Sequence, residues 1–247
     1  MRMTGNTILI TGGTSGIGLG LAQRFHAAGN KVIVAGRRED LLAKIVAEND
    51  GIDSEVLDVA DPDSITAVHR RVTSRYPELN VLINMAGVMQ TENLLDPSFL
   101  AIAETTVTTN LLGPIRMISA FMPLLTGKDH AVIMNVSSGL AFVPLPVTPT
   151  YNATKSAIHS FTESLRVQLA EKPVQIMELI PPAVQTTLLG QENDPNSMPL
   201  DEYLSEVMTI LADDPDATQI CVERVKTLRF AEADGNYDTM LKMLSGH

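Results

Sequence analysis

The sequence predicts an α/β fold in which helices cover both faces of a doubly wound parallel sheet, built as a single domain. Short runs rich in β-branched residues alternate with longer amphipathic runs, and this alternation is typical of βαβ units. The strand-like runs, such as VLIN and AVIMNV, are apolar throughout, as expected of strands buried on both faces. The 247 residues contain no linker, repeat or low-complexity segment that would divide them.

The expected elements follow one another along the chain. Strands are expected at residues 7–11, 31–36, 54–59, 81–84, 131–137 and 174–180. Helices are expected from about residue 16 and at residues 39–48, 63–76, 98–125 and about 151–170. After Pro181 a polar, Asn- and Pro-rich turn stands between helical stretches at about residues 187–212, where long insertions usually cover a site. The tail, about residues 215–247, has a helical pattern.

Composition narrows the compartment in which the protein is expected to work. The chain is 45% hydrophobic and 19% charged, which suits one domain with a large core. The single cysteine, Cys221, cannot form an internal disulfide, and no signal-peptide pattern follows Met1, so we expect a cytoplasmic protein. No apolar stretch approaches the roughly 20 residues of a membrane helix, so we expect no membrane association.

The charge balance disfavours two kinds of partner, and the histidine spacing disfavours a metal site. The formal net charge of −11 disfavours nucleic acid and anionic membranes as partners. Residues 190–247 contain 12 acidic and 4 basic residues and so carry −8 of that charge, which leaves the rest nearly balanced and able to hold a local anion site. The five histidines are far apart, with no Cys/His spacing typical of a metal site, so we expect no metal.

A glycine-rich turn follows the first expected strand. TILITGGTSGIG places Gly12, Gly16 and Gly18 between that strand and the first helix, where glycines permit a tight turn and close approach to a pyrophosphate at the helix N-terminus. A tight strand-to-helix connection without a ligand is the alternative. The position at the first crossover of the sheet favours a nucleotide site.

The end of the second strand indicates which dinucleotide would bind. An acidic residue there would hold the adenosine ribose of NAD, but the chain has Gly36 followed by Arg37 and Arg38. Guanidinium groups make charge-assisted bonds to phosphate, so this pattern favours the 2′-phosphate of NADP(H). Two alternatives stay open: the arginines are solvated residues at a helix start, or Glu39 or Asp40 restores an acid typical of NAD binding.

Tyr151 and Lys155 form a candidate acid–base pair, because YNATK places them four residues apart on one helix face. An ammonium about 4 Å from a phenol is worth on the order of 4 kcal/mol at an effective dielectric of 20, or roughly 3 pKa units. We therefore expect a lowered pKa for the Tyr151 phenol, suitable for a general acid or base. Taken alone, such a pair is commonly just a helix surface.

Two further segments support this pair. Ser138 follows the apolar run AVIMNV at the carboxyl edge of the sheet, where its hydroxyl would meet a substrate carbonyl oxygen. In TTNLLGPIRM, Pro114 cannot donate to the carbonyl of Asn110 four residues earlier, so we expect a local helix break that frees this oxygen for an ordered water. The alternative is a kinked helix with a buried, satisfied Asn110.

Five motifs together, TGGTSGIG, NMAG, Asn110, Ser138 and YNATK, resemble the short-chain dehydrogenase/reductase family in its compact single-domain branch, over about residues 7–186. The resemblance implies a Rossmann fold and a relay in which Tyr151 is the proton donor or acceptor, Lys155 tunes it and binds the nicotinamide ribose, Ser138 binds the carbonyl, and Asn110 organises water. Asp58 and Val59 would contact adenine, residues 84–87 would line the cofactor floor, and Val184 and Thr186 would hold the carboxamide. The implied cofactor-binding residues are Gly12, Thr14, Ser15, Gly16, Ile17, Gly18, Arg37, Arg38, Asp58, Val59, Asn84, Ala86, Gly87, Tyr151, Lys155, Pro181, Val184 and Thr186.

Three departures from the family pattern bear on the substrate and the assembly. Met85 replaces a second Asn, and Pro182 replaces a Gly, which removes a backbone donor beside the nicotinamide. The helical tail replaces the family's last strand, so we expect a homodimer through the helices around Asn110 and Tyr151. The Pro182 form, the segment SMPLDEYLSEVM and the tail together resemble the DltE-like oxidoreductases within the family.

These features predict an NADP(H)-dependent oxidoreductase acting on a small carbonyl or alcohol substrate, with NAD(H) as the alternative cofactor. The residues near Ser138 that suggest a substrate with an apolar flank are Leu140, Val143, Pro144, Leu145, Pro182 and Leu188. The alternative from another class is a catalytically silent nucleotide-binding sensor or interaction protein on the same fold. An isomerase or dehydratase on this sheet is a third.

Overall fold

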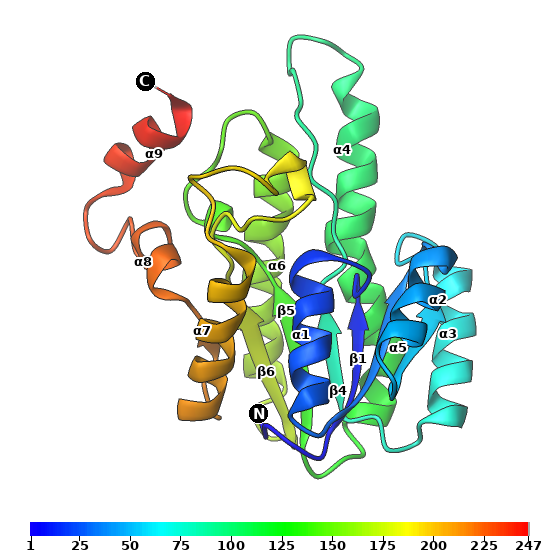
Figure 1. Ribbon diagram of the computed structural model, residues 1–247. Helices are drawn as coiled ribbons and strands as arrows, with labels where there is room; N and C mark the ends of the chain where they lie inside the picture. The colour runs from blue at the N-terminus through cyan, green and yellow to red at the C-terminus, as the bar shows by residue number, and fades with distance from the viewer. Residues whose placement is uncertain (247) are drawn as a thin grey trace.

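The computed structural model describes residues 1–246 and contains one seven-stranded sheet (Figure 1). Every strand pair is parallel, and the order is β3-β2-β1-β4-β5-β6-β7, which confirms the doubly wound fold. The strands are β1 (Thr7–Thr11), β2 (Lys31–Gly36), β3 (Ile52–Val56), β4 (Val81–Asn84), β5 (Ala131–Val136), β6 (Val174–Leu179) and β7 (Gln219–Ile220).

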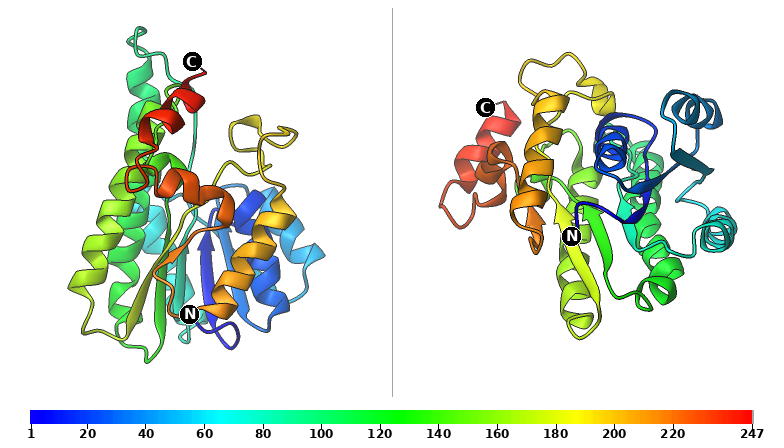
Figure 2. Two further views of the ribbon diagram at one scale, coloured as in Figure 1. Left: turned by 90° about the vertical axis from the view of Figure 1, so that its left-hand side faces the viewer. Right: turned by 60° about the horizontal axis from the view of Figure 1, so that its bottom comes forward.

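Helices cover both faces of the sheet (Figure 2). Alternate residues of β1 enter two separate cores: Ile8 and Ile10 pack on one face, and Leu9 on the other. The helices whose buried side chains join Ile8 and Ile10 are α1 (Gly16–Ala27), α2 (Glu39–Glu48), α7 (Leu200–Asp213) and α8 (Glu223–Arg229). The helices that pack with Leu9 are α3 (Pro62–Arg75), α5 (Gly113–Leu125) and α6 (Pro149–Gln168).

The third strand lies two residues earlier at its start, and three earlier at its end, than the sequence indicates. The prediction of 54–59 is wrong because the partner strand limits the pairing: Val32 pairs with Ile52, and the last pair joins Gly36 to Val56. Beyond Gly36 strand β2 has ended, so residues 57–59 leave the sheet. They line the cavity at its carboxyl edge instead of extending the strand.

The long helical region from residue 98 to 125 contains the break expected from Pro114. It consists of α4 (Phe99–Val107), the π-helical turn η1 (Thr108–Leu112) and α5, with the Gly113 amide donating to the Thr108 carbonyl. Because a proline cannot donate and crowds the preceding turn, the helix widens there instead of stopping. Asn110 lies within the widened turn.

The tail contains a short strand that the sequence pattern does not indicate. Strand β7 has two residues and pairs with Glu178 and Leu179 of β6 at the sheet edge. After it come α8 and α9 (Tyr237–Ser245), so the rest of the tail is helical as expected. The cover segment contains the 3-10 turn η3 (Leu188–Gly190) and α7, and a second 3-10 turn, η2 (Gly139–Ala141), follows β5.

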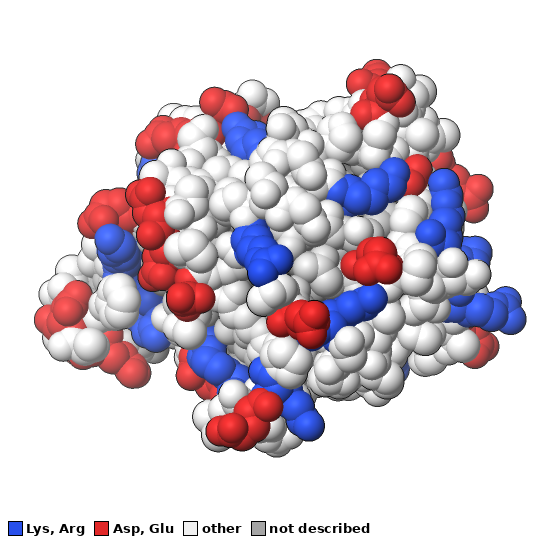
Figure 3. Space-filling view, turned by 90° about the horizontal axis from the view of Figure 1, so that it is seen from below, with Lys and Arg blue, Asp and Glu red and all other residues white. Residues whose placement is uncertain are grey.

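The surface and the single cysteine are consistent with a well-packed domain. On the face seen from below, basic and acidic side chains lie interspersed (Figure 3), with salt bridges such as Lys31–Asp53 and Arg71–Glu55 within the protein. Within residues 1–246, none of the helices combines the length and the apolar character needed to cross a membrane. Burial raises the pKa of the Cys221 thiol to about 11, which keeps it protonated among core residues.

Two tyrosines provide a test of how the packing tolerates polar groups. Tyr203 of α7 is fully buried and its hydroxyl has no hydrogen-bond partner, whereas the Tyr76 hydroxyl donates to Asp53 at 2.5 Å. Removing an unpaired buried hydroxyl relieves a desolvation cost, so Tyr203→Phe should leave the free energy of unfolding unchanged or raise it by up to about 1 kcal/mol. Tyr76→Phe should lower it by about 1–2 kcal/mol. Urea unfolding measures both, and a larger loss for Tyr203→Phe than for Tyr76→Phe would contradict this.

Candidate active site

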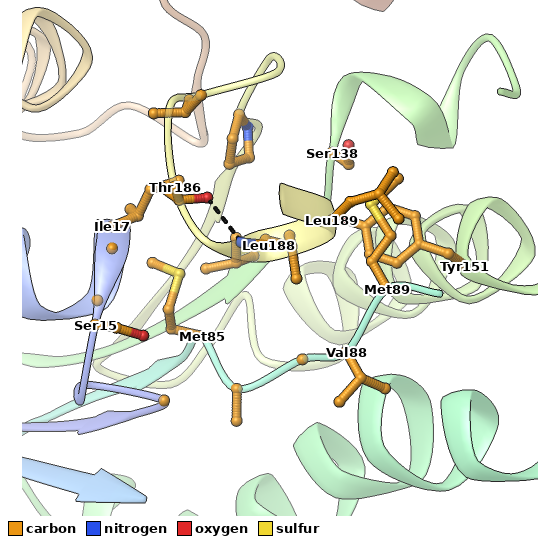
Figure 4. A pocket seen from close by; sticks show the side chains of 18 of the residues that line it. Ser15, Ile17, Met85, Val88, Met89, Ser138, Tyr151, Thr186, Leu188 and Leu189 are labelled. Atoms are coloured by element: carbon orange, nitrogen blue, oxygen red, sulfur yellow. Dashed lines mark hydrogen bonds between the residues drawn. The ribbon is translucent and has the colours of Figure 1, made fainter. Parts of the chain in front are cut away.

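One continuous cavity of about 650 Å³ lies at the carboxyl ends of the strands (Figure 4). It extends from the glycine-rich turn after β1 to the segment after β6, as expected for a doubly wound sheet. Of the sequence-predicted site residues, Asn84 and Asn110 do not line it. The others do: Gly12, Thr14, Ser15, Gly16, Ile17, Gly18, Arg37, Arg38, Asp58, Val59, Ala86, Gly87, Ser138, Tyr151, Lys155, Pro181, Val184 and Thr186.

The glycine-rich turn has the geometry that requires glycine. Gly12 has φ +68°, and a Cβ there would lie 2.7 Å from the Cα of Ala86 at the end of β4. A Cβ on Gly18 would lie 2.4 Å from the Gly12 carbonyl oxygen. The turn therefore folds tightly over the strand ends and exposes the first turn of α1 to the cavity, which suits a pyrophosphate.

The end of the cavity beside β2 is basic. Arg37 and Arg38 line it, and the Arg38 guanidinium donates to the hydroxyls of Thr14 at 2.8 Å and Ser15 at 3.1 Å. A Cβ on Gly36 would lie 2.9 Å from the Thr14 methyl group, so the turn crowds the position where an acidic side chain would otherwise stand. Glu39 and Asp40 begin α2, are exposed and are not among the cavity residues.

Helix α6 brings the candidate acid–base pair to the cavity. Thr148, the residue before this helix, is fully buried, and the Glu92 carboxylate accepts bonds from the Thr150 amide at 3.0 Å and the Thr150 hydroxyl at 2.6 Å. Glu92 comes from the segment after β4, so this segment holds the first turn of the helix that carries Tyr151. Residues 92 and 150 had not been marked by any sequence motif.

The phenol of Tyr151 is buried beside Ser138. Burial raises the pKa of Tyr151 to about 12, and a hydrogen bond with the Ser138 hydroxyl opposes that rise. The expected lowering of this pKa is therefore wrong for the protein without cofactor. The reason is the placement of Lys155: its ammonium lies 5.5 Å from the centre of the Tyr151 ring and donates to the Val136 carbonyl at 2.7 Å.

The pKa of Lys155 is also strongly shifted. Its side chain is buried, and desolvation lowers its pKa to about 8, against an opposing contribution from the negative charge of Glu178. An ammonium that titrates near neutrality at the base of a cleft is typical of a functional group. The pair Tyr151 and Lys155 thus lies in the cavity, with the cation held by β5 rather than by the phenol.

Asn110 lies below the cavity and ties two segments together. Its side-chain oxygen accepts from the Val88 amide and its side-chain nitrogen donates to the Val88 carbonyl, both at 2.8 Å. The same nitrogen is 3.4 Å from the Thr154 hydroxyl on α6. The Asn110 side chain is therefore satisfied within the protein, while a main-chain oxygen free to hold an ordered water stays a prediction.

Two polar atoms at the carboxyl edge have no partner. The side-chain nitrogen of Asn84 donates to Asn135 at 2.9 Å, but its oxygen is unpaired, and so is the hydroxyl of Ser137. Ser137 lines the cavity. Buried polar atoms normally have partners, so an unpaired hydroxyl on a residue that lines the cavity fits a nearby polar ligand, and the glycine turn and the two arginines fit a nicotinamide dinucleotide.

The segment after β6 closes the cavity from above. The Pro181 carbonyl accepts from the Gly139 amide at 2.9 Å, and Val184 is buried and bridged to Met198 of the cover segment. The Thr186 hydroxyl accepts from the Leu188 amide at 3.4 Å, which turns η3 across the cavity (Figure 4).

The apolar lining differs in part from the expected set. Leu140, Leu145, Pro182 and Leu188 line the cavity, but Val143 is fully buried and, like Pro144, lies outside it. Among the apolar lining residues that the sequence did not indicate are Met89, Leu189, Leu228 and Leu244. No local pattern marks them, because each reaches the cavity only through the path of a loop or of the tail.

A cluster on α6 and β6 offers the atoms of a metal site. The ligand atoms of His159, Glu163 and Glu178 lie within 4.8 Å of one another. Both carboxylate oxygens of the buried Glu178 contact His159 Nδ1, at 3.0 and 2.9 Å, and Arg166 pairs with Glu163 at 2.7 Å. This pairing satisfies the cluster without an ion, and the absence of a metal stays a prediction.

Comparison with known proteins gives consistent results. A family model described as short chain dehydrogenase matches residues 6–197. The uncharacterized oxidoreductase DltE of Bacillus subtilis is 36% identical over 257 residues, covering 99% of this chain and 98% of that protein. The NADP-dependent 3-hydroxy acid dehydrogenase of Schizosaccharomyces pombe is 35% identical over 193 residues, covering 75% of this chain and 74% of that protein.

The fold also matches solved structures. The crystal structure of a short chain dehydrogenase from Burkholderia cenocepacia in complex with NADP has a TM-score of 0.83 and 23% sequence identity, covering 98% of this chain and 99% of that one. At this identity the likeness concerns the fold.

The buried Lys155 yields a stability prediction. Its folded pKa, about 8, is below the unfolded value of 10.5, so the charge destabilises the fold below pH 8 and stability rises with pH between 8 and 10.5. The cost at pH 7 is about 3 kcal/mol, of which a lost hydrogen bond to Val136 would offset about 1. Lys155→Met should therefore raise the free energy of unfolding at pH 7 by about 1–2 kcal/mol.

Urea unfolding of wild type and Lys155→Met at pH 7 and pH 9.5 tests this. The advantage of the variant should shrink at the higher pH, and the exposed Lys172→Met should change stability by less than about 0.5 kcal/mol at either pH. A variant less stable than wild type at pH 7 would show that the buried ammonium is better solvated than its burial indicates.

Proposed function

The chain belongs to the short-chain dehydrogenase family, and we propose that it is an NADP(H)-dependent enzyme that interconverts a small carbonyl compound and its alcohol. One observation carries this proposal: Ser138, Tyr151 and Lys155 line the same cavity as the glycine-rich turn and the two arginines. A reacting group beside the phenol would therefore share one enclosed space with a dinucleotide.

The proposed chemistry follows from the protonation states of the site. When bound, the nicotinamide supplies the hydride that the carbonyl carbon accepts. Ser138 would hold the carbonyl oxygen, and Tyr151 would give it a proton. A phenol whose pKa is about 12 is protonated at neutral pH, so Tyr151 carries the proton that it would donate in reduction.

Lys155 and Asn110 would support this step. The Lys155 ammonium would hold the nicotinamide ribose and favour the phenolate that remains after proton transfer, because a cation in a buried site stabilises a developing anion. Asn110 would place a water between this lysine and solvent, a role supported by its position in the π-helical turn η1. Balanced over all atoms, a carbonyl compound, NADPH and a proton give an alcohol and NADP⁺.

The preference for NADP(H) is supported by Gly36, Arg37 and Arg38 at the end of β2. The two guanidinium groups would contact the 2′-phosphate, while Asp58 and Val59 would contact adenine. The cofactor floor would be Asn84, Ala86 and Gly87, and Pro181, Val184 and Thr186 would face the nicotinamide. The name of the related 3-hydroxy acid dehydrogenase, NADP-dependent, agrees with this preference.

We also propose a homodimer that acts in the cytoplasm. The helices around Asn110 expose apolar side chains, namely Leu100, Val107 and Leu112, which suit a protein contact. A sedimentation mass equal to one chain would contradict the dimer. The single cysteine supports a reducing compartment.

The proton donor can be tested directly. Tyr151→Phe should lower kcat for NADPH-dependent carbonyl reduction by about 10²- to 10⁴-fold, because the ring stays while the proton source is lost. NADPH affinity should change by less than about threefold, measured by fluorescence titration. Unchanged turnover in the variant would eliminate Tyr151 as the donor, and a wild type that binds NADPH but reduces no carbonyl would favour the silent sensor.

The cofactor preference has its own test. Arg37→Ala and Arg38→Ala should each raise the KM for NADPH by about 10- to 100-fold, because each removes a charge-assisted bond to phosphate, while the KM for NADH stays within about twofold. Arg70→Ala, an exposed arginine on α3, should change neither value. Equal losses with both cofactors would mean that the arginines act on the fold or on the pyrophosphate instead of reading the 2′-phosphate.

A further inference from the structure

The tail reaches into the cavity from a distant part of the chain. Leu228 of α8 and Leu244 of α9 line the same space as Ser138 and Tyr151. Helix α9 lies beside α8, above the carboxyl ends of the strands and on the β7 side of the molecule (Figures 1 and 2). Each of the last two helices therefore contributes one leucine to the cavity lining, and Leu228 lies against Gly139, next to Ser138.

Helix α9 has an apolar face that the protein covers only in part. Tyr237, Met240, Leu241 and Leu244 recur at the spacing of one helix face and are half-buried, whereas Met243 on another face is 61% exposed. No residue of α9 is fully buried. Because Leu244 belongs to this face and lines the cavity, an apolar ligand group there would complete its burial.

Apolar side chains also gather around Tyr151. Met89, Leu189 and Tyr151 gather at one end of the cavity in Figure 4, away from Ser15 and Ile17 at the other end. Leu189 has φ +55°, a left-handed conformation that costs a leucine about 1 kcal/mol or more. The turn η3 thus holds a leucine, instead of a glycine, at a cavity position where glycine would be unstrained.

Charge is confined to the cofactor half of the cavity. Its charged lining residues are Arg37, Arg38 and Asp58 at the adenosine end, and Lys155 beside Tyr151. Among the described residues that line the remainder, none would pair with an anion. A carboxylate or phosphate on the substrate would be buried there without a counter-ion, which is strongly unfavourable.

We infer that the substrate is an uncharged carbonyl compound with an apolar chain, and that Leu244 of the tail binds the far end of that chain, while Leu228 lies nearer to Ser138. This inference rests on the proposed function, and it names the substrate class. The tail thus selects substrates by the length of their apolar chain and by their charge.

Three methyl ketones form a matched set of probes with NADPH: 2-butanone, 2-nonanone and 8-oxononanoate, which has the length of 2-nonanone and ends in a carboxylate. For the wild type, kcat/KM should rise from 2-butanone to 2-nonanone by 100-fold or more, at about threefold to fourfold per buried methylene. It should fall by at least about 100-fold from 2-nonanone to 8-oxononanoate.

Substitutions in the tail test whether the preference for the longer ketone depends on Leu244. Leu244→Ala should lower kcat/KM for 2-nonanone by about tenfold and leave 2-butanone within about twofold, because only the long chain reaches the tail. Met243→Ala, on the exposed face of the same helix, should change neither. Leu244→Lys should reverse the preference in favour of 8-oxononanoate, since it supplies the missing cation.

A binding measurement removes the dependence on turnover. Calorimetric titration of 2-nonanone into protein saturated with NADP⁺, a pair that has no hydride to transfer, should give a dissociation constant about tenfold weaker for Leu244→Ala than for wild type. Equal losses for 2-butanone and 2-nonanone in Leu244→Ala, good use of 8-oxononanoate by wild type, or no binding of 2-nonanone would each overturn the inference. By contrast, 2-nonanone binding that depends on Leu244, together with no reduction of any ketone, would support the substrate class and count against the proposed function.

Discussion

A buried positive charge governs the arrangement of this site. The Lys155 ammonium is removed from water, and its position is held by the Val136 carbonyl at the end of β5, with the negative charge of Glu178 on β6 opposing the cost of burial. An isolated ammonium in a protein interior shifts toward its neutral form, so strands β5 and β6 must end in register for the charge to persist near neutrality. The parallel sheet supplies this register, because its carbonyl ends meet along one edge. The phenol of Tyr151, one helical turn away, is buried by the same packing.

Much of the fold follows from local sequence. The strands at 7–11, 31–36 and 81–84 and the helix at 39–48 begin and end as predicted, because each is a short apolar or amphipathic run bounded by glycine or polar residues. The third strand was misplaced since its limits depend on its pairing with β2 and not on its own residues. Likewise, the sequence shows that Gly36 stands where an acidic residue would bind NAD. Only the folded turn shows the Thr14 methyl group that crowds a Cβ at this position.

The residues of the site also fall into those that local sequence predicts and those that it does not. Motifs at strand ends and at fixed helical spacing identified the residues around the glycine turn, Ser138 and Tyr151, because local chain geometry brings these to one edge. They did not identify Glu92, Leu189 or Leu244, whose positions depend on long connections. The sign of the Tyr151 pKa shift was also missed, because spacing on a helix gives the distance between side-chain origins and says nothing of burial or of where an ammonium turns for its hydrogen bond.

The hydrogen bonds that Thr150 donates to Glu92 join the segment after β4 to the first turn of α6. The segment at residues 85–88 lines the cavity and continues to Glu92, which accepts two bonds at the start of α6. Any displacement of this segment by an occupant of the cavity would be transmitted mechanically to the first turn of α6, and so to the orientation of the phenol. Substitutions in the loop at residues 91–98 would thereby alter turnover without touching a reactant, which makes this loop a route by which new selectivities arise while the reacting groups stay the same.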